Sequence, residues 1–148
     1  MDTLNESQRS YNMSQIKSKD TKPEMILRKF LHAEGIRFRL HGKSKGEKLP
    51  GTPDIVLPKY KTVINVNGCF WHGHQGCKYF RLPKSRVDYW EWKISRNRAN
   101  DILNKHKLTE MGWNVITVWE CEIKEKRRET FHNLLLLLAN IKTKAKQT

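Results

Sequence analysis

Acidic residues are scarce in this chain. Its 148 residues hold 15 Asp and Glu against 29 Lys and Arg, which gives a formal net charge of +14 at pH 7. A surplus of this size favours binding to a polyanion, because a cationic surface releases the counterions that surround the polyanion. We therefore expect a nucleic-acid partner, in preference to a ribosome-associated or membrane-surface role.

Long apolar runs are absent as well. The nearest candidate, residues 134–139, is far too short to cross a bilayer, and the N-terminal segment lacks the apolar core of a secretory signal. These absences predict a cytoplasmic protein with no membrane partner. Because no internal repeat or long linker interrupts the sequence, we expect one domain over residues 20–140. A flexible polar arm at 1–19 and a basic tail at 141–148 would flank it.

Cysteines are few and odd in number: Cys69, Cys77 and Cys121. An odd count without a signal peptide argues against a disulfide framework and favours a metal site. Two of the thiols share a short loop with His72 and His74, and the third follows a predicted strand. With one histidine, the three thiols would form the Cys₃His set of a structural zinc site. We expect His74 to be the ligand, although the spacing also allows His72.

Helical periodicity recurs in three segments. A capping box at Thr21 and Glu24 predicts the start of the first helix, and Gly35 its end. Ser85 with Asp88 predicts the start of a long helix that reaches roughly residue 107. One apolar stripe marks the last helix and comprises Phe131, Leu134, Leu135 and Leu138.

Strand patterns fill the intervals between these helices. Strands are expected at 36–40, 54–57, 61–66 and 113–119. The second and third flank a short turn at 58–60 and form a hairpin, whereas residues 41–53 form a basic loop. The resulting order α, β, β, β, α, β, α predicts a mixed central sheet flanked by helices.

Several ionisable side chains occupy positions that core packing does not require. Asp54 starts an apolar strand, where a carboxylate can hold a divalent cation or simply end a turn. Glu24 is explained by its capping box alone. Asp101 shares a helix stripe with apolar residues and would pair with an arginine or orient a histidine. If zinc takes His74, the zinc loop would hold His72 ready to act as a general base.

Two aromatic side chains adjoin these histidines. Phe70 and Trp71 are neighbours on the loop, so they cannot both point into one core. In a basic protein, such rings can insert between bases and unstack a duplex. Trp90 could join them from the long helix, or it could pack in the core as its stripe suggests.

Four motifs together resemble the very-short-patch-repair mismatch endonucleases of bacteria: "KDTKPE", "PGTPD", "GCFWHGH" and "GWNVITVWEC". The resemblance runs from about Asn12 to Cys121. It implies a fold similar to type II restriction endonucleases, one structural zinc ion and a requirement for magnesium. It also implies the activity of the family, which nicks one strand of duplex DNA on the 5′ side of the thymine in a T:G mismatch. Such mismatches arise when 5-methylcytosine deaminates.

The resemblance assigns roles to individual residues. Asp54 is similar to the magnesium-binding aspartate, and the backbone carbonyl of Val66 would be a second metal contact. His72 is similar to the catalytic histidine that activates water, and Glu24 and Asp101 match two further acidic positions of the active site.

Three further groups of residues match the family. The zinc ligands correspond to Cys69, His74, Cys77 and Cys121. The wedge that enters the DNA beside the mismatch corresponds to Phe70, Trp71 and Trp90. The arm that reaches the opposite groove resembles the polar stretch around Asn12 and Met13.

One position departs from the family pattern. Asn67 stands where the best-known member has a second active-site histidine, and the acid-x-lysine tripeptide of restriction nucleases is absent. An amide can donate a hydrogen bond to a phosphate but cannot act as a base near neutral pH. Asn67 therefore makes His72 more important to the reaction.

The resemblance favours a monomeric, nucleoid-associated mismatch endonuclease, and two alternatives stay open. One is a restriction-type nuclease that cuts a matched site. The other is a zinc-stabilised nucleic-acid-binding module without catalysis. The sequence also leaves open whether mismatch-repair proteins bind the chain and which bases flank the mismatch.

Overall fold

The structure is a computed structural model that describes residues 21–44 and 47–147. The arm predicted at residues 1–19, with Asn12 and Met13, lies outside the described residues. Within the described part of the chain, no helix is both long and apolar enough to cross a membrane.

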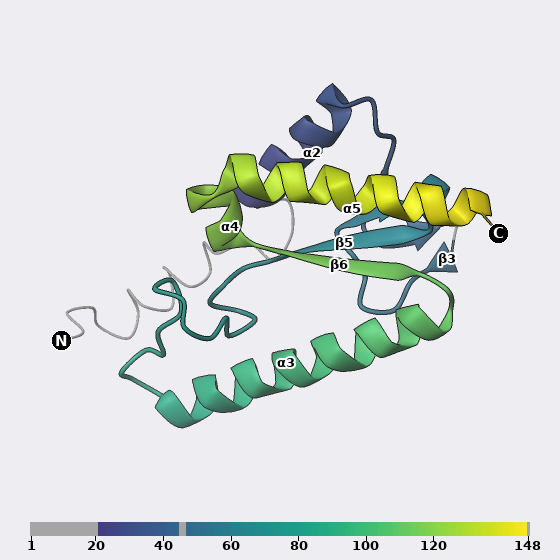
Figure 1. Ribbon diagram of the computed structural model, residues 1–148. Coiled ribbons are helices and arrows are strands. Elements are labelled where there is room, and N and C mark those ends of the chain that lie inside the picture. Colours follow the sequence, from purple (N-terminus) through teal and green to yellow (C-terminus); the bar gives the residue numbers. More distant parts are fainter. Residues whose placement is uncertain (1–20, 45–46, 148) are drawn as a thin grey trace.

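A four-stranded mixed sheet forms the centre of the molecule (Figure 1). Its order is β1 (Arg39–Leu40), β4 (Ile55–Leu57), β5 (Thr62–Asn67) and β6 (Asn114–Trp119). β4 is antiparallel to β1 and to β5, whereas β5 and β6 are parallel. The predicted hairpin is confirmed: β4 and β5 are joined by the short 3₁₀ helix η1 (Pro58–Tyr60). The parallel pair needs a long crossover, and a helix supplies it.

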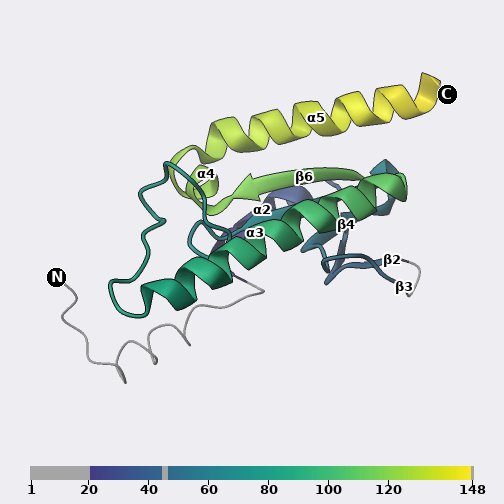
Figure 2. The ribbon, with the colours of Figure 1, turned by 90° about the horizontal axis from the view of Figure 1, so that it is seen from below.

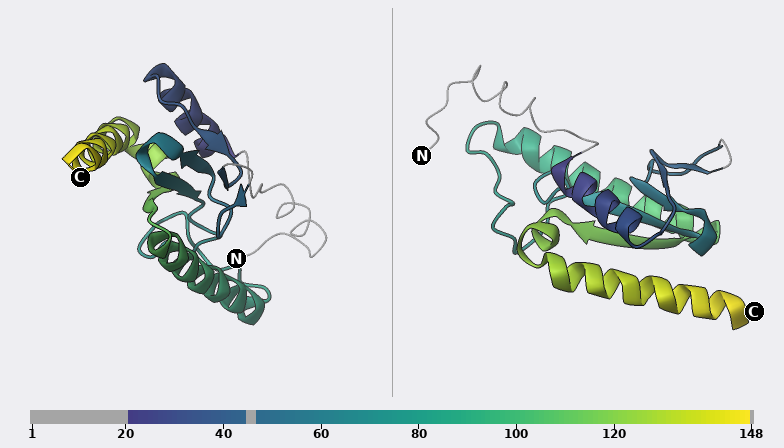
Figure 3. Two further views of the ribbon diagram at one scale, coloured as in Figure 1. Left: turned by 90° about the vertical axis from the view of Figure 1, so that its right-hand side faces the viewer. Right: turned by 90° about the horizontal axis from the view of Figure 1, so that it is seen from above.

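Helices cover both faces of this sheet (Figures 1 and 3). α2 (Lys22–Ala33), α4 (Glu120–Glu125) and α5 (Arg127–Gln147) lie on one face, and the crossover helix α3 (Val87–Glu110) lies on the other (Figure 2). The mixed sheet flanked by helices is the predicted fold class, which is therefore confirmed.

Two apolar cores result, one on each face of the sheet. Ile64 and Val66 of β5 pack with α2 and α5, whereas Val63 packs with Leu108 of α3. Because side chains alternate along a strand, Asn65 lies on the same face as Val63, toward α3. Polar side chains at the end of β5 therefore enter the space between the sheet and α3, and this is where the candidate site lies.

The loop prediction for residues 41–53 is wrong in part. β2 (Lys43–Ser44) and β3 (Glu47–Lys48) form a two-stranded antiparallel ribbon within it. β1 is also shorter than the strand predicted at 36–40. Strands of two residues are too short to produce a recognisable alternation of polar and apolar side chains.

Helix ends also differ from the prediction. Ser85 does not cap α3, which begins at Val87 after Arg86, a left-handed residue with φ 56° and no side-chain cap. The short helix α4 was not predicted. α5 continues to Gln147, so residues 141–147 extend the last helix. Helix starts without a side-chain cap leave little trace in a sequence.

Candidate active site and metal centre

Asp54 links the start of β4 to the end of β5. Its Oδ2 atom accepts a hydrogen bond of 2.7 Å from the backbone N–H of Val66. The two strands are antiparallel, so the beginning of one lies beside the end of the other. This geometry brings the Asp54 carboxylate next to the last residues of β5.

Burial and a second carboxylate raise the pKa of Asp54 to about 7. Burial is the larger cause, and the negative charge of Glu24 is the next; the Val66 N–H, His72 and Arg28 oppose them. Glu24 comes from α2, is only 2% exposed and pairs with Arg28 (Nη2 to Oε2, 3.3 Å). Two carboxylates with hard oxygen donors in one largely buried place suit a divalent cation, which would favour their charged forms.

His72 and Asp101 form a close pair across the space between loop and helix. His72 Nδ1 lies 2.6 Å from Oδ2 of Asp101, which comes from α3. If Nδ1 donates its hydrogen to this carboxylate, Nε2 is left as the ring nitrogen that can accept a proton. The pair therefore has the arrangement of a general base held by an orienting acid. The sequence left two partners open for Asp101, an arginine or a histidine, and the structure shows the histidine.

One polar cavity of about 390 Å³ unites most of these groups. Five residues expected at the site line it: Asp54, Val66, Asn67, His72 and Asp101. Glu24 is placed near it through its effect on Asp54. The cavity also has two amide side chains that sequence reasoning missed, Asn65 and Asn104. Asn65 stands two residues before Asn67 in an apolar strand, and this position is the one signal that could have revealed it.

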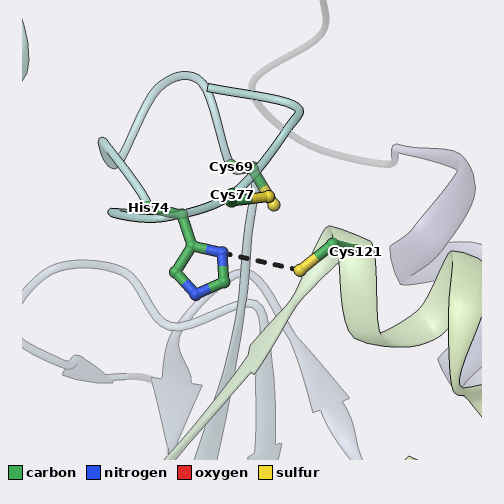
Figure 4. Close-up of side chains that lie close together, drawn as sticks. All are labelled: Cys69, His74, Cys77 and Cys121. Carbon is green, nitrogen blue, oxygen red and sulfur yellow. Dashed lines mark hydrogen bonds between the residues drawn. The ribbon is translucent and has the colours of Figure 1, made fainter. Parts of the chain in front are cut away.

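The four residues expected to bind zinc come together beyond the C-terminal ends of the parallel strands β5 and β6 (Figure 4). The ligand atoms of Cys69, His74, Cys77 and Cys121 all lie within 4.8 Å of one another. Sγ of Cys121, at the start of α4, is 3.5 Å from Nδ1 of His74. Three thiols and one imidazole at such distances fit the donor set of a tetrahedral site that can hold a metal ion. His74 belongs to this cluster, and His72 is paired elsewhere.

The surroundings of the cluster hold its ligands in place. The ring of His74 stacks on Trp119, with centroids 4.0 Å apart and an interplanar angle of 7°. The Cys69 N–H donates to Oε1 of Glu120 over 3.4 Å. Burial raises the pKa of the Cys69 thiol far above its ordinary value, so a thiolate here requires a positive partner such as a metal cation.

An aromatic cluster lies beside the same loop. The ring centroids of Phe70, Trp71 and Trp90 are 5.2 to 5.7 Å apart. Trp90 is buried, whereas Phe70 and Trp71 are partly exposed. Among the described residues, the buried indole N–H of Trp71 has no hydrogen-bond partner. Trp90 thus forms the base of the cluster, and the two loop rings lie on it.

A single loop therefore carries three residues of a cluster that could hold a metal ion, a paired histidine and two aromatic rings, beside a cavity with carboxylates. Comparison with known proteins identifies the family of the chain. The family model described as "DNA mismatch endonuclease Vsr" matches residues 1–78, more than half of the chain.

Curated relatives match this chain over most of their own length. The type II nicking enzyme V.XorIIP of Xanthomonas oryzae is 51% identical over 84% of this chain and 88% of its own. The type II nicking enzyme V.NmeAIP of Neisseria meningitidis is 46% identical over 90% and 94% of the two chains. The DNA mismatch endonuclease Vsr of Escherichia coli is 38% identical over 87% and 80%. The chain is therefore an endonuclease that acts on DNA, and it belongs to the Vsr family of DNA mismatch endonucleases.

Proposed function

We propose that this endonuclease nicks one strand of duplex DNA on the 5′ side of the thymine in a T:G mismatch, with magnesium as its cofactor. The observation that carries the proposal is the His72–Asp101 pair, which lines the same cavity as the Asp54 carboxylate. The name of the Escherichia coli relative supports the mismatch, and those of the other two support nicking. One chain supplies all these groups, which is consistent with a monomer acting on chromosomal DNA in the cytoplasm.

Oxygen atoms around Asp54 fit a magnesium ion. The Asp54 carboxylate and the Val66 carbonyl would be its protein ligands, with the charge of Glu24 nearby. When bound, magnesium would stabilise the negative charge that develops on the phosphate and the leaving oxygen. The Asn67 amide, 8% exposed and on the cavity wall, would donate a hydrogen bond to a phosphate oxygen.

His72 would carry out the proton transfer. In the proposed step, Nε2 takes a proton from water as the water oxygen bonds to phosphorus and the P–O bond on the other side breaks. The leaving oxygen keeps the electron pair of that bond. Asp101 holds the ring through Nδ1 and stabilises the imidazolium that forms. Because Asn67 cannot accept a proton near neutral pH, no base at that position would share this task.

The aromatic cluster would recognise the mismatch. Phe70 and Trp71 would enter the base stack beside the mismatch, while Trp90 supports them from α3. A buried N–H without a partner costs about 1–3 kcal/mol, so the free protein does not hold Trp71 in an optimal core position. Zinc in the Cys₃His cluster would have a structural role, since all four positions are protein ligands.

A nicking assay tests the proposal directly. Two end-labelled duplexes would differ in one base pair, T:G against C:G, and each would be incubated with magnesium or with EDTA. A single-strand cut beside the mismatched thymine, dependent on magnesium, is expected. Asp54→Asn and His72→Gln should bind this duplex but cut it at least about a hundredfold more slowly. Equal cutting of both duplexes would instead indicate a restriction-type enzyme, and binding without cutting in any divalent metal would indicate a non-catalytic module.

A further inference from the structure

The loop that carries His72 is in close contact with α3 at Gly73. The Arg98 guanidinium donates two hydrogen bonds to the Gly73 carbonyl, one from Nε at 3.0 Å and one from Nη2. Gly73 is buried with φ +59°, and a Cβ atom there would lie 2.5 Å from Cγ2 of Ile94 and 2.6 Å from Arg98 Nε. The contact therefore leaves no room for a side chain between the loop backbone and the helix.

The position of Gly73 in the loop gives this contact its importance. The residue before it is His72, whose ring pairs with Asp101, and the residue after it is His74, whose ring joins the metal cluster. The two rings diverge from the short stretch of backbone that Arg98 holds. A fixed Gly73 backbone therefore limits the positions that the neighbouring His72 and His74 side chains can take.

α3 is well suited to hold the loop in this way. Arg98 and Asp101 are three residues apart, so they project from the same side of the helix. One binds the loop backbone and the other binds the His72 ring. The Arg98 guanidinium also lies 5.5 Å from the ring centroid of Phe80, farther along the loop. The two donors on the Gly73 carbonyl and this stacking match the planar fork of arginine and not the point charge of lysine.

We propose that Arg98 is a positioning residue for the reaction: it holds the Gly73 carbonyl so that His72 stays paired with Asp101. The proposal rests on the function proposed above only for its kinetic consequence. Without Arg98, the Gly73 carbonyl loses both donors, and the Gly73–His74 peptide keeps only the hydrogen bond of 2.9 Å from its N–H to the Cys69 carbonyl, so its orientation is less firmly fixed. His72 then leaves the geometry in which Nε2 can take a proton from water. A displacement of about 1 Å at a reacting group can lower a rate about a hundredfold.

Kinetics of three variants test this role. Arg98→Ala removes both hydrogen bonds, Arg98→Lys keeps the charge but not the fork, and Arg96→Ala is the matched control. Arg96 lies on the same helix, stacks on the exposed ring of Trp92 (5.4 Å) and gives the same loss of charge as Arg98→Ala. At saturating T:G duplex, the nicking rate should fall about a hundredfold in Arg98→Ala and about tenfold in Arg98→Lys. The half-saturating DNA concentration should change equally in Arg98→Ala and Arg96→Ala, and Arg96→Ala should keep the wild-type rate.

A second measurement needs neither DNA nor turnover. Proton NMR of the free, metal-loaded protein should show the His72 Nδ1–H resonance, slowed in exchange by the 2.6 Å contact with Asp101. Arg98→Ala should lose or broaden this resonance, and Arg96→Ala should retain it, with metal content unchanged in both. This result would stand even if the T:G substrate were wrong.

Three outcomes would overturn the proposal. The first is a wild-type His72 resonance in a folded Arg98→Ala. The second is a loss of activity confined to the half-saturating concentration, as expected for a phosphate contact. The third is a loss of bound metal in proportion to activity, which would make Arg98 a support of the metal cluster alone. If Arg98→Ala does not fold, Arg98→Lys decides by the same three criteria.

Discussion

Protons and magnesium should compete for Asp54. Compared with the unfolded chain, the folded, metal-free protein favours the neutral carboxyl group of Asp54, because burial and then Glu24 raise its pKa from 3.8 to about 7. Asp54 therefore contributes stability that is fully present below the unfolded-state pKa of 3.8 and is lost as the pH rises through about 7. Three pKa units correspond to at most about 4 kcal/mol. Bound magnesium would offset this loss, since the cation favours the carboxylate.

The magnitude of the effect on metal binding follows from the fraction ionised. With a pKa of about 7, roughly one-tenth of Asp54 is charged at about pH 6 and roughly nine-tenths at about pH 8. Because the cation binds the carboxylate, its apparent affinity should rise about tenfold over this interval. Glu24→Gln removes the second cause of the raised pKa, so the rise should occur at lower pH. Asp54→Asn should abolish it.

Manganese titrations followed by electron paramagnetic resonance measure this affinity without turnover. They would be made on the wild type, on both variants and on His72→Gln, which removes a histidine that lines the same cavity. Affinity that changes less than about threefold in the wild type between about pH 6 and about pH 8 would contradict the argument. So would a tenfold change that disappears in His72→Gln, because the histidine would then be its source.

Three further changes probe the loop. Cys121→Ser should release the bound metal and lower the free energy of unfolding by about 3 kcal/mol or more, whereas a variant with stoichiometric metal and wild-type melting would not use this ligand. Trp71→Ala should reduce the preference for T:G over C:G duplex more than it reduces general duplex affinity. An unchanged preference would show that the Trp71 ring serves in packing and not in mismatch recognition. Gly73→Ala should lower the nicking rate about tenfold or more, since its Cβ would lie 2.5 Å from Cγ2 of Ile94 at φ +59°; wild-type rates would show that the loop adapts freely.

The larger elements of this fold could be predicted because their patterns are strong. Val63 and Ile64 stand in an apolar run that is typical of a strand covered on both faces, and the run follows a short proline turn. The mixed sheet and its long crossover helix follow from such patterns. α4 and the β2–β3 ribbon could not be predicted, since a single helical turn or a pair of residues has no periodicity to detect.

The site was less accessible to prediction, and the two loop histidines show why. His72 and His74 are two residues apart, and donor counting allows either one to complete the metal cluster. The choice depends on the backbone at Gly73, whose left-handed conformation turns the two rings apart. Asn104 could not be predicted for a related reason. An amide side chain on a helix carries no sign of function in the sequence, and only the fold places it at the cavity.

The Cys₃His cluster and α3 both contact the same loop. Cys121 ties the loop to α4, which packs with α2 and α5 on one face, whereas Arg98 and Asp101 tie it to α3 on the other (Figure 1). The loop therefore bridges the two layers at the end of β5, and His72 lies between its two attachments. If His72 is the proposed base, its position depends on the packing of both layers. Substitutions that shift α3 against the sheet should consequently slow nicking more than they weaken DNA binding, even where they lie far from the cavity. Leu108→Ala, at the buried contact of α3 with Val63, is one such substitution.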